Sequence, residues 1–180
     1  MYAGNNKLAL DSQKRIAEAL LSLLKDYQFN NICISLICKE ANISRQTFYS
    51  LFDSKEDVII FALGEEACYE PDNKKEDCSC VNYLSEDFSH YLIKHKDLLT
   101  MLMNNGIMHL FLDMQYHNFY DCEEFMKGKS DEERSYAASY LAGAFTGIAK
   151  NYTRCTCKHT QKELKDITLC LLKGNLFNKE

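Results

Sequence analysis

The sequence predicts an all-helical protein on three grounds. Its 180 residues contain one proline and seven glycines, too few for a turn-rich β fold. Apolar residues recur at spacings of three and four through most of the chain. Two segments begin with a Ser/Thr-x-x-Glu capping box, a typical start of an α-helix. We expect a three-helix domain with a linking helix at 1–64 and a helical bundle at 65–180.

The first helix is expected at about Ser12 to Asp26. Its apolar residues lie on one side of a helix, so they should supply the core of the first domain. They are Ile16, Ala17, Leu20, Leu21 and Leu24.

Residues 34–55 predict two short helices joined by a tight turn. On the first of these helices an apolar stripe forms one face; its members are Ile34, Ile37, Cys38 and Ala41. In the turn, Asn42 tolerates a left-handed backbone, Ile43 is an apolar anchor and Ser44 can cap the next helix. In that next helix Phe48 and Phe52 share an inward face.

The other faces of the second helix carry residues that can contact DNA. Arg45 can pair bidentately with guanine, and Gln46 can pair with adenine. Thr47, Tyr49 and Lys55 suit phosphate oxygens, which fix the register of a protein on a duplex. From spacing alone, an ordinary corner between two helices in any helical protein remains an alternative.

Residues 12–63 resemble the DNA-binding domain of the TetR family of transcriptional regulators. The shared positions are Ile37 with Cys38, the turn 41–44, Tyr49, Phe52 and Lys55. The sequence departs from the family pattern at Gln28, Cys33 and Asn42. The resemblance implies DNA contacts by Ser35, Ser44, Arg45, Gln46, Thr47, Tyr49, Ser50 and Lys55.

A fourth helix should link this domain to the rest of the chain. Ser54 and Asp57 give its capping signal, and Val58, Phe61 and Ala62 form its apolar side. Residues 70–80 contain the single proline and are expected to be a loop between the domains.

The helices expected at about 84–102 and 107–120 are rich in aromatic residues and methionine. In TetR-like proteins the central helices generally hold an effector, which here would be a small apolar or aromatic molecule. Core packing is the alternative for such a stripe. The predicted pocket residues are Tyr91, His95, Met103, Met108, Phe111 and Met114, with Tyr116 and Phe119 nearby.

The last two helices have the clearest predicted starts, at Ser130 with Glu133 and at Thr160 with Glu163. The first should run from Asp131 to about Arg154. The family resemblance implies that these helices form a four-helix interface in a homodimer, while an intramolecular core is the alternative. The predicted interface residues are Tyr140, Ala144, Gly147, Ile148, Leu164, Ile167 and Leu171.

The net charge of −5 is unevenly distributed. Residues 1–64 contain seven basic and seven acidic residues, whereas residues 65–91 contain two basic and eight acidic ones. A neutral DNA-binding domain releases few counterions, so a single copy should bind DNA weakly. Two copies bound together are therefore expected.

Nine cysteines without an export signal indicate reduced thiols. Cys155, Cys157 and His159, and separately Cys78 and Cys80, nevertheless allow a thiol- or metal-responsive regulator as an alternative. They lack the paired CxxC spacing of a structural zinc site, and we predict no metal and no cofactor.

The sequence also argues against two other classes of protein. The five histidines are not accompanied by a nucleophile–base–acid signature, a phosphate-binding glycine loop or an HExxH pair. We therefore expect that the protein is not an enzyme. There is no apolar run long enough to span a bilayer and no signal peptide, so we expect a cytoplasmic protein without a membrane partner.

The prediction from sequence is a sequence-specific regulator that binds double-stranded DNA as a homodimer, a repressor controlled by a small-molecule effector. A TetR-like interaction protein that has lost specific DNA binding is a further alternative, because the DNA-binding domain is neutral.

Overall fold

The computed structural model describes residues 4, 6–64, 80–156 and 159–174. Within these ranges the chain forms helices joined by turns, and the predicted all-helical class is confirmed. The elements in order are α1 (Lys7–Leu23), a 3-10 turn η1 (Phe29–Asn31), α2 (Ile34–Glu40), α3 (Arg45–Leu51), α4 (Lys55–Gly64), α5 (Cys80–Lys94), α6 (Lys96–Asn104), α7 (Met108–Tyr120), α8 (Asp131–Arg154) and α9 (Gln161–Leu172).

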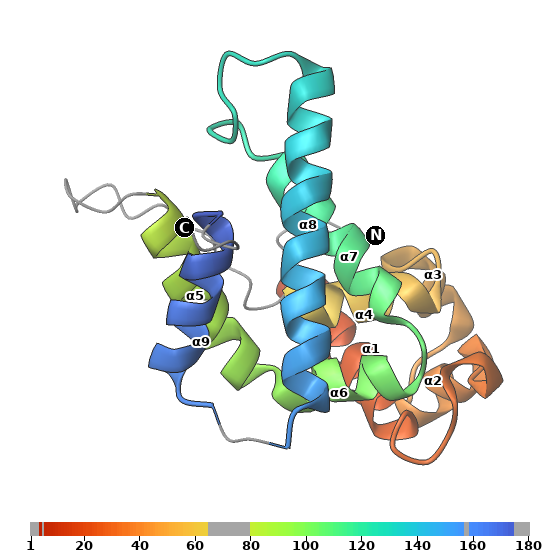
Figure 1. Cartoon of the computed structure of the whole chain (residues 1–180). Helices are drawn as coiled ribbons and strands as arrows, with labels where there is room; N and C mark the ends of the chain where they lie inside the picture. Colours follow the sequence, from red (N-terminus) through yellow and green to blue (C-terminus); the bar gives the residue numbers. More distant parts are fainter. Residues whose placement is uncertain (1–3, 5, 65–79, 157–158, 175–180) are drawn as a thin grey trace, which may run out of the picture.

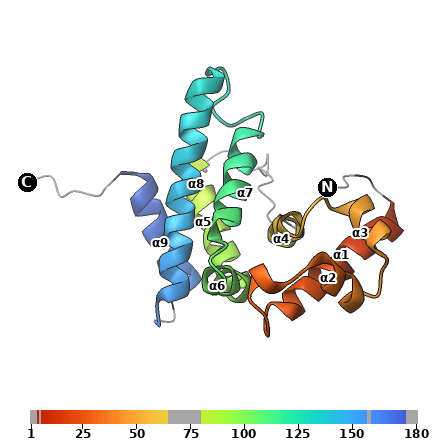
Figure 2. The ribbon, with the colours of Figure 1, turned by 90° about the vertical axis from the view of Figure 1, so that its right-hand side faces the viewer.

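Helices α1 to α3 form a headpiece at one side of the molecule, and α4 lies between it and α7 (Figure 2). The headpiece packs around α1, whose Ile16 and Leu20 are fully buried. Phe48 and Phe52 are also buried, with ring centroids 6.0 Å apart, as predicted from their spacing. Burial of these large apolar side chains is the main contribution to the stability of this small unit.

Helix α1 begins earlier than the sequence predicted. It starts at Lys7, where the side chain of Asn6 caps it by accepting a hydrogen bond from the Leu8 amide at 3.0 Å. The first turns face solvent, and Leu8 is 77% exposed. No apolar stripe marks these turns, which explains why a pattern of buried residues placed the start near Ser12.

The remaining helices form a bundle around the long helix α8 (Figure 1). Helix α7 packs along α8, and α5 packs along α9. The headpiece core and the bundle core are continuous through α4, where Val58, Ile59 and Leu63 are fully buried between α1 and α7. The buried side of α4 therefore differs from the predicted one: Val58 is buried as expected, whereas Phe61 and Ala62 are only partly buried.

The helix predicted at 84–102 is divided at His95 into α5 and α6. His95 leaves helical geometry with φ −102° and ψ 18°. Backbone hydrogen bonds nevertheless continue across it, from the His95 amide to Tyr91 and from the Leu99 amide to His95, both at 2.9 Å. Because the apolar spacing survives this bend, the sequence pattern did not reveal it.

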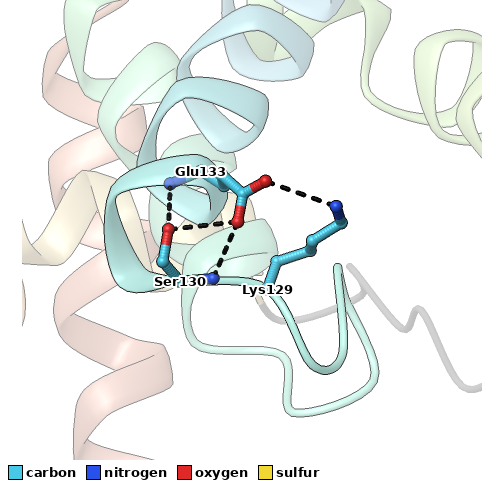
Figure 3. A network of polar contacts seen from close by, with 3 residues as sticks. All are labelled: Lys129, Ser130 and Glu133. Carbon is cyan, nitrogen blue, oxygen red and sulfur yellow. Dashed lines mark hydrogen bonds and ion pairs between the residues drawn. The ribbon is translucent and has the colours of Figure 1, made fainter.

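Both predicted capping boxes are present. Figure 3 shows the one at α8, where the Ser130 hydroxyl accepts from the Glu133 amide at 3.2 Å. The Glu133 carboxylate in turn accepts from the Ser130 amide at 3.0 Å and from the Lys129 ammonium at 3.3 Å. These interactions lower the pKa of Glu133, chiefly through the backbone hydrogen bond from Ser130. Thr160 and Glu163 cap α9 in the same way.

Two side chains of the bundle form hydrogen bonds with α4 and with the headpiece. The Tyr91 hydroxyl of α5 donates to the Leu63 carbonyl in the last turn of α4 at 3.0 Å. The Asn105 amide, after α6, accepts from the Phe29 backbone amide at 2.8 Å and donates to the Met101 carbonyl at 2.9 Å. The bundle is thus hydrogen-bonded both to α4 and to the η1 turn of the headpiece. In the described ranges, no helix is both long enough and apolar enough to cross a bilayer.

Candidate functional sites

The first candidate site is the exposed surface of α2 and α3. The turn between them has the predicted chemistry, since Asn42 has φ 51° and the Ser44 hydroxyl accepts from the Thr47 amide at 3.0 Å. Arg15 of α1 donates to the Ala41 carbonyl at 2.6 Å, so the C-terminal end of α2 is fixed from outside. A specific hydrogen bond therefore ties the end of α2 to α1, and the capped turn leads directly into α3.

Most of the residues predicted to contact DNA lie on this exposed surface. The guanidinium of Arg45 lies 6.0 Å from the centroid of the Tyr49 ring, so the two side chains are neighbours on α3. Thr47 is half-buried, and its hydroxyl lies 2.9 Å from that of Ser44. The exposed members are Ser35, Ser44, Arg45, Gln46, Tyr49 and Ser50.

Lys55 is placed differently from the prediction. Its ammonium donates to the carbonyls of Phe29 at 2.6 Å and Ile32 at 2.9 Å, and it lies 4.3 Å from the centroid of the Phe29 ring. The side chain therefore holds the segment between α1 and α2. The phosphate contact predicted for Lys55 does not follow from this geometry, because two of the three ammonium protons are already used within the protein.

The second candidate site is a cavity of about 430 Å³ in the bundle. Its walls come from α5, from the second half of α7, from the segment that follows α7, and from Phe145 of α8. Arg134 fixes the start of that segment by donating to the carbonyls of Tyr120 at 2.6 Å and Cys122 at 3.2 Å. The cavity is in the size range of small-molecule sites.

Few of the residues predicted for an effector pocket line this cavity. Tyr91 is the one member of the predicted set that lines the cavity, together with the nearby Phe119. Met108, Phe111 and Met114 are buried in the core, as the alternative interpretation had it, whereas His95 and Met103 are half-buried away from the cavity.

Several cavity residues were missed because they do not form an apolar stripe. Asp87 precedes the buried Phe88 on α5, and Gln115 follows the buried Met114 on α7. The remaining wall is the irregular segment after α7, including Phe125. Helical periodicity gives no information about such a segment, although a polar residue next to a buried one was a usable signal.

The third candidate site is a groove of about 570 Å³ between α8 and α9. All seven residues predicted for the dimer interface line it. Tyr140 is 62% exposed and Ile167 is 43% exposed, whereas Leu164 is buried at the base. A Cβ atom added at Gly143 or Gly147 would meet no atom within 4 Å. Gly143 and Gly147 are thus not used to pack α8 against another helix among the described residues of the chain.

The residues suspected of metal or thiol chemistry are only partly described. Cys155 and His159 both line the groove, but Cys157 and Cys78 lie outside the described residues. In the part of the chain that the structure describes, no group of three His, Cys, Asp or Glu side chains is arranged to hold a metal ion.

Comparison of the sequence with known proteins finds a related transcriptional activator. No protein-family model matches the chain. The chain is 28% identical over 159 residues to the transcriptional activator DhaS of the dhaKLM operon from Lactococcus lactis, and this match covers 81% of each protein.

Solved structures show the same fold. Lin0861 from Listeria innocua matches 97% of this chain and 96% of its own, with a TM-score of 0.78 and 13% identity. A structure of the dihydroxyacetone kinase operon activator DhaS matches 93% of this chain and 97% of its own, with a TM-score of 0.53 and 23% identity. A TetR transcriptional regulator from Streptococcus agalactiae matches 92% and 96%, with a TM-score of 0.53 and 21% identity. The predicted resemblance to TetR-type regulators is confirmed, and the chain has their fold.

Proposed function

We propose that this TetR-like chain is a transcriptional regulator that binds specific DNA sequences as a homodimer and responds to a small molecule. The observation that carries the proposal is the short helix α3, which is capped by Ser44 and presents Arg45 and Gln46 to solvent. Both side chains can make two hydrogen bonds to a base edge in the major groove. The curated relative and two of the similar structures are named as transcriptional regulators, which supports the same function.

Dimerisation is supported by the groove between α8 and α9. The groove suits a second copy of the same two helices. It exposes Tyr140 and Ile167, and the surface at Gly143 and Gly147 is not covered by any other part of the described chain. Symmetric contacts of this kind place two headpieces on one duplex, and half-sites one helical turn apart then lie on one face of the DNA. A dimer also compensates for the neutral headpiece, because two weakly binding units act on one site.

Effector control is supported by the position of the cavity. Tyr91 lines it and also donates a hydrogen bond to α4, the helix that leads from the headpiece. A ligand that binds one arrangement of α5 and α4 better than another shifts the population toward that arrangement. In a dimer this changes the distance between the two headpieces. The direction of regulation depends on where the operator lies relative to the promoter. Repression is the expectation from sequence, whereas the curated relative is named an activator.

The test is selection of bound duplexes from a random DNA pool by the purified full chain, at moderate salt and under reducing conditions. The proposal predicts enrichment of a palindromic motif. A folded protein that enriches no motif would contradict it and favour an interaction protein without specific DNA binding.

A further inference from the structure

The cavity has an unusual combination of lining groups. Its wall is rich in aromatic rings, and its charged lining residues are Asp87 and Glu124. Among the described residues that line it there is no lysine, arginine or histidine. A cavity that contains carboxylates and no cation disfavours an anionic ligand and favours a cationic one.

Asp87 is the deeper of the two carboxylates. It is half-buried on α5, and among the described residues it makes no hydrogen bond or ion pair. Burial raises the pKa of Asp87, and the charge of nearby His90 only partly opposes this. Glu124, by contrast, is 66% exposed and forms an ion pair with Lys127 at 2.8 Å. Asp87 is therefore the group whose charge a ligand can compensate.

Gln115 gives a second, independent indication of a ligand. It lines the cavity from α7 and is only 8% exposed. Its side-chain amide forms no hydrogen bond with any of the described residues. Its amide nitrogen and oxygen are not among the fully buried polar atoms that lack a partner, so they remain accessible where Gln115 lines the cavity. A polar group on a bound molecule would satisfy this amide.

The aromatic wall suits the apolar part of such a molecule. Phe88 and Phe145 stack with their centroids 4.1 Å apart, and Phe119 lies 5.5 Å from Phe145 and 5.4 Å from Phe125. These rings come from α5, α7, α8 and the segment after α7. Because each ring lies next to another, together they form one continuous aromatic wall. Aromatic faces attract flat apolar groups and also organic cations.

We infer that this cavity binds an amphipathic organic cation, with its flat apolar body against the aromatic wall and its ammonium group paired with Asp87. The Gln115 amide then hydrogen-bonds a polar group of the ligand. This inference rests on the proposed function, because it specifies the class of the effector. The ligand is small, as the cavity volume of about 430 Å³ requires.

The experiment compares three probes that share a naphthalene ring and differ in charge: 2-naphthylmethylammonium, 2-naphthylmethanol and 2-naphthoate. Calorimetric titration of the full chain without DNA should show that the cation binds about fivefold tighter or more than the alcohol, and that naphthoate binds weakest. The Asp87→Asn variant should bind the cation and the alcohol alike.

The matched control is Asp113→Asn. Asp113 is an exposed residue of α7 that does not line the cavity, so this variant should keep the preference for the cation. Circular dichroism establishes that each variant is folded. The inference is overturned if the folded parent binds none of the probes, if the alcohol or naphthoate binds as tightly as the cation, or if Asp87→Asn keeps the preference. The titration contains no DNA, so its outcome does not depend on whether the chain binds a specific DNA sequence. The two proposals can therefore fail separately.

Discussion

Arg45 and Gln46 lead α3 with exposed side chains, whereas Tyr49 lies one turn further along the same helix. If the first two read bases, replacing either with Ala should reduce discrimination between the selected duplex and a scrambled one by about 1–3 kcal/mol. Fluorescence anisotropy on both duplexes measures this difference.

Tyr49→Phe is the comparison for that experiment. The hydroxyl of Tyr49 is predicted to contact a phosphate. Removing it should therefore weaken binding to both duplexes by the same factor. If all three variants weakened both duplexes equally, the separation of base contacts from phosphate contacts would be wrong.

Asp87 makes the stability of the protein depend on pH. Its folded-state pKa is raised, chiefly by burial, so folding favours the protonated carboxyl. The stability associated with that proton is complete at acidic pH and is lost as the pH rises through the raised pKa. At pH 7 the Asp87→Asn variant should therefore melt at a higher temperature than the parent.

Melting temperatures of both proteins, measured from neutral to acidic pH, check this prediction. The difference should shrink as the pH falls through the raised pKa of Asp87. An Asn variant that melts below the parent at neutral pH would show that the carboxylate is stabilised in the folded chain, and would contradict the account of the cavity.

Individual residues were predictable where one short-range interaction fixes them. Asn42 adopts the expected positive φ and Ser44 caps α3, because both depend on neighbours along the chain. Lys55 was not predictable in this way. Its ammonium reaches the carbonyls of Phe29 and Ile32, and that contact exists only once α1 and α4 have packed together.

Helices α8 and α9 carry the proposed dimer interface, and Ile167 is its exposed apolar residue on α9. Ile167→Glu should convert a dimer into a monomer, because a charge buried between two copies of the groove has no partner. Sedimentation velocity measures the change in mass, and DNA affinity should fall with it.

Leu8→Glu is the matched control for this substitution. Leu8 is 77% exposed on α1, in the headpiece, and it does not line the groove. Its replacement should leave the protein dimeric. A parent that sediments as a monomer at micromolar concentration, or an Ile167→Glu variant that stays dimeric, would refute the proposed interface.

The helix boundaries that were predicted correctly depend on caps, whereas those that were missed depend on exposure or packing. The starts of α8 and α9 follow from capping boxes that are local in sequence. The start of α1 and the bend at His95 leave the apolar pattern unchanged, so that pattern could not locate them. The cavity was missed because part of its wall is the non-helical segment after α7.

In the whole molecule, the headpiece and the bundle share one core and are joined by the hydrogen bonds Tyr91–Leu63 and Phe29–Asn105. Tyr91 belongs to both the cavity and the first of these links. Tyr91→Phe keeps the ring and removes the hydroxyl. It should therefore retain binding of the naphthyl cation and reduce the effect of that cation on DNA affinity.

Titration of the selected duplex with and without the cation measures this coupling, with the parent as reference. The effect of the cation on the DNA dissociation constant should be smaller in Tyr91→Phe than in the parent. An unchanged effect would mean that coupling between the cavity and the headpiece does not depend on the Tyr91–Leu63 hydrogen bond.

In the proposed function, two copies of this chain act together on one specific DNA site. The measurement that tests this most directly is the mass of the complex formed with the selected duplex, by sedimentation or mass photometry under reducing conditions. We expect two chains on each palindromic duplex, and far weaker binding to a duplex that contains one half-site. A complex of one chain per duplex, or equal binding to scrambled DNA, would contradict it.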